Sequence, residues 1–184
     1  MTRTILINKD NKIKDNYLNK INLVQTKDIY NNDIKVEEET YNAYLQLQDF
    51  LQKENINIAI TSAYRTLEEQ QATLEEFIEK YGEEYAYKAV APVGTSEHHT
   101  GLALDIVSMS YQLLDKEQEN TPEQQWLMHN SYKYGFILRY PNDKSEITGI
   151  HYEPWHYRYV GKEIAKKIYE QGICLEEYLE NLQK

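Results

Sequence analysis

Residues 96–105 read SEHHTGLALD, a histidine-containing turn that passes through glycine into an apolar run and ends on an aspartate. Further along the chain, residues 153–156 read EPWH. Together the two stretches offer two candidate histidine ligands, an aspartate, and a glutamate three residues before the second histidine. Zinc sites that hydrolyse amides need about three nitrogen or oxygen ligands, an open position for water, and a carboxylate base beside it. The two stretches therefore predict a metal-dependent hydrolase.

The spacing of the candidate ligands indicates how the chain presents them. His98 and Asp105 are seven residues apart. That separation suits a loop end followed by a strand, and it does not suit one helical face, where neighbours recur every three or four residues. His156 completes a His-Asp-His set from a neighbouring strand. Glu153 is then predicted to be the general base and not a ligand, because it must take a proton from the attacking water.

The other histidines are not predicted to bind the metal. His99 follows His98 directly and would point to the opposite side of an extended chain. His151 lies two residues before Glu153, so in a strand the two side chains would be on the same face. His151 could then support the site without binding the metal itself. His129 falls in a predicted helix away from both stretches and is expected at the surface.

Three polar residues outside the ligand set are candidates for substrate contacts, and each has a plain alternative. Arg65 can stabilise an oxyanion or hold a carboxylate in a forked pair, or it can be a surface arginine at a helix start. Ser96 can donate a hydrogen bond to a substrate carboxylate, or it can cap its own loop. Gln70 lies about one turn beyond Arg65; it can reach the same cleft or remain an exposed residue of the helix.

The composition narrows the class of protein. The chain has 184 residues, a net charge of −10 and a sequence pI near 5.0, and its length suits one domain over residues 1–184. The acidic balance argues against a phosphate-binding footprint for nucleic acid and against a polybasic membrane anchor. The single cysteine, Cys174, excludes an internal disulfide and is expected to be a buried, unreactive thiol.

The apolar segments bear on where the protein works. No stretch approaches the ~20 apolar residues that span a bilayer, so no membrane span is expected. The first residues lack the apolar core of a signal peptide. If Met1 is the native start, we expect a cytoplasmic protein; if the chain is trimmed, an exported or membrane-anchored protein is expected instead. A monomer is the default expectation.

The pattern of apolar residues and breakers predicts an α+β fold with a small antiparallel sheet flanked by helices. Residues 1–37 are rich in Asn, Lys and Asp and are predicted to form an irregular N-terminal wrap with one or two short strands. Thr66 with Glu69 fits a capping box at a helix start. Helices are predicted at 38–54, 67–81, 85–90, 121–134, 161–171 and 175–182. Strands are predicted at 56–60, 102–107, 136–139, 149–152 and 155–159.

Four segments follow one another in the order and at the separations of a known family. They are residues 62–66 (SAYRT) with Gln70, 96–105 (SEHHTGLALD), 134–141 (YGFILRYP) and 147–161 (ITGIHYEPWHYRYVG). On these segments the chain resembles the zinc D-alanyl-D-alanine carboxypeptidases of the VanY type. The resemblance covers the catalytic core expected at residues 55–165. One departure is that Val93 precedes Gly94, where the family usually has proline.

The resemblance implies a fold and a set of roles. The fold is the small α+β fold shared by the D-Ala-D-Ala peptidases and the Hedgehog signalling domain. One zinc ion per chain is implied, bound by His98, Asp105 and His156. Glu153 is implied as the catalytic base, and Arg65 as the group that stabilises the developing oxyanion. Gln70 and Ser96 are implied to contact the terminal D-alanine.

The resemblance also implies a substrate, the D-Ala-D-Ala end of a peptidoglycan precursor. A leaderless member is similar to the VanXY proteins, which cleave both the free D-Ala-D-Ala dipeptide and the pentapeptide precursor, and this implies a role in glycopeptide (vancomycin) resistance. Two alternatives stay open. An L,D-carboxypeptidase that trims tetrapeptides would have an identical metal site. A non-catalytic peptidoglycan-binding zinc module is the other, although Glu153 and Arg65 argue against it because binding alone needs no base.

Overall fold

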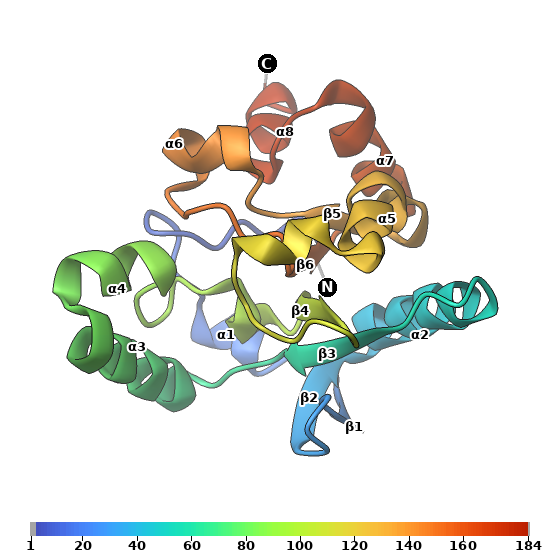
Figure 1. Ribbon diagram of the computed structural model, residues 1–184. Coiled ribbons are helices and arrows are strands. Elements are labelled where there is room, and N and C mark those ends of the chain that lie inside the picture. The colour runs from blue at the N-terminus through green and yellow to red at the C-terminus, as the bar shows by residue number, and fades with distance from the viewer. Residues whose placement is uncertain (1–2, 184) are drawn as a thin grey trace.

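A computed structural model describes residues 3–183. A four-stranded antiparallel sheet and a separate two-stranded sheet are surrounded by helices (Figure 1). In spatial order the strands of the larger sheet are β3 (Ile58–Ser62), β4 (Ala103–Ser108), β6 (His156–Tyr159) and β5 (Phe136–Leu138). This arrangement confirms the predicted α+β class.

Strand β4 lies inside the sheet and is buried along its whole length. Its apolar side chains, including Leu104 and Ile106, are fully buried in the main core. The register of the sheet matters for the site, because Asp105 of β4 is paired with His156 of β6. Directly paired residues have Cβ atoms about 4.5–5.5 Å apart. Formation of the sheet therefore brings two of the predicted ligands together.

Helices cover the sheet and build three apolar clusters. Helix α2 (Glu38–Lys53) and helix α5 (Pro122–Asn130) contribute to the main core. Helices α3 (Leu67–Tyr81) and α4 (Glu83–Ala89) pack on each other in a second cluster. A third cluster joins the C-terminal helices to the sheet. Its helices are α7 (Lys162–Gln171) and α8 (Leu175–Asn181).

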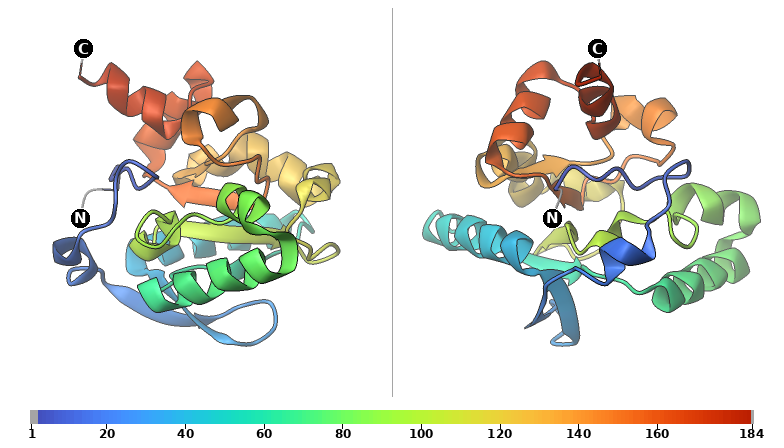
Figure 2. Two further views of the ribbon diagram at one scale, coloured as in Figure 1. Left: turned by 90° about the vertical axis from the view of Figure 1, so that its left-hand side faces the viewer. Right: turned by 180° about the vertical axis from the view of Figure 1, so that it is seen from behind.

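The predicted short strands form in the N-terminal part of the chain, which is more regular than the irregular wrap expected there. It holds a short helix, α1 (Asp15–Leu18), and the antiparallel pair β1 (Leu23–Lys27) and β2 (Asp33–Glu37), which projects from the body in Figure 1. Seen from behind in Figure 2, the first residues run between the C-terminal helices and the rest of the fold. Contacts described below join this segment to the interior.

Most of the predicted helix boundaries are confirmed. Thr66 and Glu69 form the predicted capping box of α3, and Gly82 follows its last residue. The Thr121 side chain caps α5 by accepting a hydrogen bond from the backbone N–H of Gln124. That helix is shorter than predicted, however, because residues 131–134 tighten into a 3-10 turn, η3 (Ser131–Tyr134).

The strand predicted at residues 149–152 is wrong. The chain forms two short helical turns, η4 (Asn142–Lys144) and α6 (Ser145–Thr148), and then runs as a loop to β6. Gly149 closes α6 with φ of 75°, a left-handed conformation that interrupts any extended run. The alternating apolar pattern here reflects one-sided burial of a loop. None of the described helices is long and apolar enough to cross a membrane.

Candidate active site

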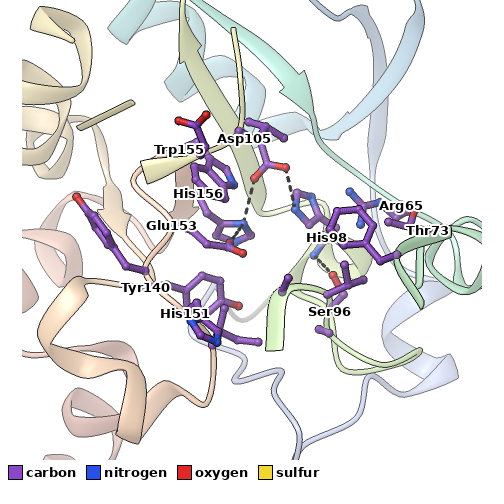
Figure 3. Close-up of a pocket in the computed structure, with 18 of the residues that line it drawn as sticks. Arg65, Thr73, Ser96, His98, Asp105, Tyr140, His151, Glu153, Trp155 and His156 are labelled. Carbon is purple, nitrogen blue, oxygen red and sulfur yellow. Dashed lines mark hydrogen bonds and ion pairs between the residues drawn. The ribbon is translucent and has the colours of Figure 1, made fainter. Parts of the chain in front are cut away.

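Three side chains from two parts of the chain converge on one point at the edge of β4. Asp105 Oδ1 lies 3.1 Å from His156 Nδ1, and Asp105 Oδ2 lies 3.4 Å from His98 Nε2. One donor atom from each residue lies within 4.8 Å of the others, and all three residues are buried. Figure 3 shows the two imidazole rings on either side of the Asp105 carboxylate. The predicted ligand set is thus brought together.

The local backbone explains how His98 enters the site. It lies on the 3-10 turn η1 (Glu97–Thr100), which ends at Gly101 with φ of 70°. A Cβ at Gly101 would lie 3.0 Å from the Glu37 side chain, so the turn requires glycine both for its backbone angle and for space. The chain then enters β4, which places His98 and Asp105 at the two ends of a tight, rigid segment.

The orientation of His98 suits a ligand of a cation. Its Nδ1 lies 2.6 Å from the carbonyl oxygen of Ala63, which can only accept, so Nδ1 carries the proton. Burial lowers the pKa of His98, although the nearby Asp105 opposes this, and the neutral form is favoured. Nε2 then turns a lone pair toward the Asp105 carboxylate. Two acceptors face each other at 3.4 Å, and a bound cation resolves the repulsion.

The donor set fits a divalent transition metal. Two imidazole nitrogens and one carboxylate oxygen, with a cleft on one side, are the ligands of a catalytic zinc site with an open position. The pKa of His156 is raised to about 9: burial lowers it, but the neighbouring Asp105 and Glu97 carboxylates outweigh burial. The pKa of Asp105 is held well below its usual range by the two histidines, against the effect of burial. A metal would replace the proton on His156.

Glu153 lies beside the ligands without being one of the close set. Its Oε2 is 3.6 Å from His156 Nδ1, and its side chain is 13% exposed toward the cleft. Burial raises the pKa of Glu153 to about 8, and the neighbouring Asp105 and Glu97 carboxylates add to the rise against His156 and Arg65. A carboxyl poised near neutral pH next to a metal position is the pattern of a general base or acid.

Arg65 reaches the cleft because two side chains fix its guanidinium. Its Nη1 donates to Gln70 Oε1 at 3.0 Å, and its Nη2 donates to Ser62 Oγ at 2.9 Å. Gln70 is only 1% exposed and donates in turn to the Ala91 carbonyl at 2.6 Å. The alternative of an exposed Gln70 is therefore wrong. Arg65, Gln70 and Ser96 all line the cleft.

Ser96 has the capping role that was one of its two alternatives. Its Oγ accepts a hydrogen bond from the His98 amide at 3.3 Å, and the residue is 4% exposed. The hydroxyl hydrogen is not used in that contact. Ser96 can therefore cap η1 and still donate into the cleft that it lines.

The remaining histidines divide as predicted, with one exception. His99 points away from the site, is fully buried, and bridges the Arg65 carbonyl and the Gly94 amide. His129 is exposed on α5. His151 does not share a strand face with Glu153, since no strand forms there; it is an exposed residue on the rim of the cleft.

The predicted ligands lie at the floor of a cleft of about 510 Å³. Several lining residues were not found from the sequence, and most of them are aromatic or aliphatic: Phe77, Tyr85, Leu114, Tyr140, Tyr152 and Trp155. Tyr140 is buried, and its ring centre lies 4.8 Å from that of His156. Glu97 was also missed, although it stands between Ser96 and His98 in the most telling stretch of the sequence. An acidic residue beside a predicted ligand was the available signal.

Comparison with known proteins shows which family the chain matches. The family model "VanY: D-alanyl-D-alanine carboxypeptidase" matches residues 33–162. A D-alanyl-D-alanine carboxypeptidase of Enterococcus faecalis (strain ATCC 700802 / V583) is 42% identical over 95% of this chain and 65% of its own length. The bifunctional D-Ala-D-Ala dipeptidase and carboxypeptidase VanXYC of Enterococcus gallinarum is 41% identical over 66% of each chain. The chain spans 55% of the putative carboxypeptidase YodJ of Bacillus subtilis (strain 168), at 42% identity over 81% of this chain.

Solved structures show the same fold. The LD-carboxypeptidase LdcB aligns with a TM-score of 0.84 at 38% identity, covering 95% of this chain and 84% of LdcB. VanYB in complex with D-alanine-D-alanine aligns with a TM-score of 0.81 at 37% identity, covering 97% of both chains. A VanY D,D-pentapeptidase variant in complex with Zn(II) has the same TM-score and identity and covers 97% of this chain and 99% of its own.

Proposed function

Because the chain belongs to the VanY family of D-alanyl-D-alanine carboxypeptidases, we propose that it is a zinc-dependent D,D-carboxypeptidase acting on peptidoglycan precursors. The observation that carries the proposal is the convergence of His98, Asp105 and His156 at the floor of a cleft, with Glu153 beside them. A relative that binds Zn(II) and one that binds D-Ala-D-Ala support the metal and the substrate class.

The proposed metal is held by His98, Asp105 and His156. The chemistry that a bound zinc ion supplies is Lewis-acid polarisation of the scissile carbonyl and of the attacking water. Glu153 Oε2 lies 3.6 Å from His156 Nδ1, next to the proposed metal position. It takes the proton from the attacking water and delivers it to the nitrogen of the departing D-alanine, as a base and then an acid.

Arg65 is proposed to stabilise the developing oxyanion. Its contacts to Gln70 and Ser62 leave Nε–H and part of the guanidinium edge for the cleft. Fixed donors aimed at a developing charge cost no reorganisation in the transition state. Gln70 acts mainly through Arg65, since its amide oxygen is already used and it is almost fully buried. Ser96 is proposed to donate a hydrogen bond from its hydroxyl to the terminal carboxylate.

We propose a second activity on free D-Ala-D-Ala, supported by the likeness to VanXYC. Removal of D-Ala-D-Ala ends deprives a glycopeptide antibiotic of its target, so the proposed role is resistance to vancomycin. The cytoplasm is the proposed compartment, because the free dipeptide and the soluble precursor meet there. Fractionation of native cells tests this: recovery of the protein only from the outer face of the membrane contradicts it.

An L,D-carboxypeptidase is the second candidate, favoured by the alignment with LdcB. Both candidates use the same ligands and base, and differ only in the residue before the scissile bond. The deciding experiment measures D-alanine release from D-Ala-D-Ala, a muramyl pentapeptide and a muramyl tetrapeptide, with a chelator and with zinc restored. Release from the pentapeptide, lost with chelator and with Glu153→Gln, supports the D,D-activity. Release from the tetrapeptide alone supports the L,D-activity. Zinc binding without any release leaves a binding module.

A further inference from the structure

A cluster of four buried charges lies behind the metal ligands, on the far side of His156 from the cleft. Glu97 is 1% exposed, Arg139 1% and Arg158 0%, and Glu176 of α8 completes the cluster at 7%. Taking such charges out of water costs several kcal/mol per ion unless each is well paired. The proposed chemistry uses none of the four, so their presence needs another explanation.

The two carboxyl oxygens of Glu97 are used very differently. Oε1 accepts hydrogen bonds from Arg139 Nε at 2.8 Å and from Arg158 Nη1 at 2.6 Å. Oε2 has no hydrogen-bond partner among the described residues, although it is buried. Two arginines thus orient the carboxylate through one oxygen and leave the other free.

The free oxygen faces one of the ligands. His156 Nε2 is also buried and also lacks a hydrogen-bond partner within residues 3–183. The two atoms lie 3.8 Å apart, slightly too far for a hydrogen bond and too close for another group to separate them. Buried polar atoms without partners are rare in native proteins, and here a possible donor and an acceptor without partners lie next to each other.

We infer that Glu97 is a positioning residue for the metal site, accepting a hydrogen bond from His156 Nε2–H. This contact keeps the proton on Nε2 and leaves the lone pair on Nδ1, the atom that faces Asp105. Carboxylates that orient a ligating histidine in this way also raise its basicity. The inference deepens the proposed zinc site and rests on it.

The neighbouring contacts show that the arginines do not need Glu97 for all their pairing. Arg139 donates to both oxygens of Glu176, at 2.9 and 2.6 Å. Arg158 donates to the carbonyl oxygens of Arg3 and Ile5, at 3.0 and 2.8 Å. The arginines are thus tied to helix α8 and to the N-terminal segment, and both ends of the chain support the orientation of one carboxylate.

The test compares Glu97→Gln with Glu176→Gln in the full chain. Both changes remove one carboxylate partner of Arg139, but only Glu97 reaches His156. Zinc affinity is measured by competition with a chromophoric chelator, with circular dichroism to establish that each variant is folded. We expect Glu97→Gln to weaken zinc binding about 10–100-fold and Glu176→Gln to change it less than about threefold. Equal zinc affinities of Glu97→Gln and the unaltered protein would overturn the inference.

A second measurement needs no substitution, and it decides the matter if Glu97→Gln does not fold. Nitrogen-15 NMR of the zinc-loaded, unaltered protein reports which nitrogen of His156 carries the proton. A protonated Nε2 with slow hydrogen exchange is expected; a proton on Nδ1, or an Nε2–H that exchanges as fast as those of exposed histidines, overturns the inference. If the unaltered protein takes up no zinc, the proposed metal site itself fails, which is a different outcome from equal affinities.

Discussion

The floor and the rim of the cleft differ in almost every respect. The floor is built on β4, η1 and β6, and its residues are buried and joined by backbone pairing and short polar contacts. The rim carries exposed apolar side chains from separate elements, among them Tyr85 at 56% and Leu114 at 44%. The floor is thus preorganised by the same sheet that forms the core, whereas the rim side chains are exposed to solvent.

This difference predicts a division of labour. Preorganised polar groups lower a transition-state energy because they need not move. Loosely packed apolar groups contribute to binding by burying substrate surface and adapt to its shape. We therefore expect floor substitutions to affect metal binding and kcat, and rim substitutions to affect KM and substrate preference.

The largest effect is expected from loss of a ligand on the floor. Asp105→Asn replaces the carboxylate that both histidines face, so turnover should fall to background. Zinc affinity should fall by more than the ~10–100-fold expected for a group outside the ligand set. Chelator competition measures the affinity, and the exposed Asp33→Asn on β2 is the control. Zinc affinity that survives Asp105→Asn would remove Asp105 from the ligand set.

The base is expected to separate chemistry from metal binding. Glu153→Gln should lower kcat about 10²–10⁴-fold, the usual contribution of general acid–base catalysis. Zinc affinity should be nearly unchanged, because Glu153 lies beside the ligand set and not in it. Steady-state kinetics on a zinc-saturated sample gives the first quantity and chelator competition the second. A parallel loss of both would make Glu153 a ligand.

Arg65 and Gln70 should differ in the size of their effects. Arg65→Ala removes a donor aimed into the cleft and should cost about 10²–10³-fold in kcat. Gln70→Ala should cost about tenfold, since Ser62 still holds the guanidinium. The comparison of kcat and KM for the two variants is the test. A larger loss from Gln70→Ala than from Arg65→Ala would show that Gln70 contacts the substrate directly.

Buried Glu153 on the floor should also destabilise the folded protein when no metal is bound. The pKa of Glu153 is about 8 in the folded chain against an ordinary value of 4.5. A raised carboxyl pKa means that the fold favours the protonated form. The cost of burying Glu153 is absent below pH 4.5, grows as pH rises, and is complete above pH 8. In protein stripped of metal by a chelator, Glu153→Gln should therefore raise the free energy of unfolding by about 1–3 kcal/mol near pH 8. Near pH 4 it should leave that free energy unchanged. Thermal unfolding at several pH values checks this; a pH-independent difference would contradict it.

The smallest effect is expected at the rim. Tyr85→Ala should raise KM for the pentapeptide about threefold to tenfold, with kcat and zinc affinity unchanged. The reason is that it removes apolar contact with the substrate that contributes about 1 kcal/mol to binding. Tyr87 offers a matched control, because it is a similarly exposed tyrosine of the same helix and does not line the cleft. Equal effects of Tyr85→Ala and Tyr87→Ala on KM would show that the α4 side of the rim does not bind substrate.

The sequence by itself determined the parts of this protein that depend on local chemistry. Breakers and caps marked the helices, as at Thr66 and Gly82. The apolar run that follows Gly101 marked β4. The residue types of the two motifs predicted the ligands and the base, because few other functions need histidine, aspartate and glutamate at such spacing.

Only the tertiary structure decided how distant residues meet. The register that pairs Asp105 with His156 depends on packing across the whole sheet. The sequence left Gln70 open between the cleft and an exposed helix face, and its burial and its hydrogen bond to the Ala91 carbonyl decided between them. Glu97 gained its partners from Arg139, directly after β5, and from Arg158 of β6, both far along the chain. A sequence records which groups are present, but burial and pairing are properties of the packed chain, and these set the energy of a buried charge.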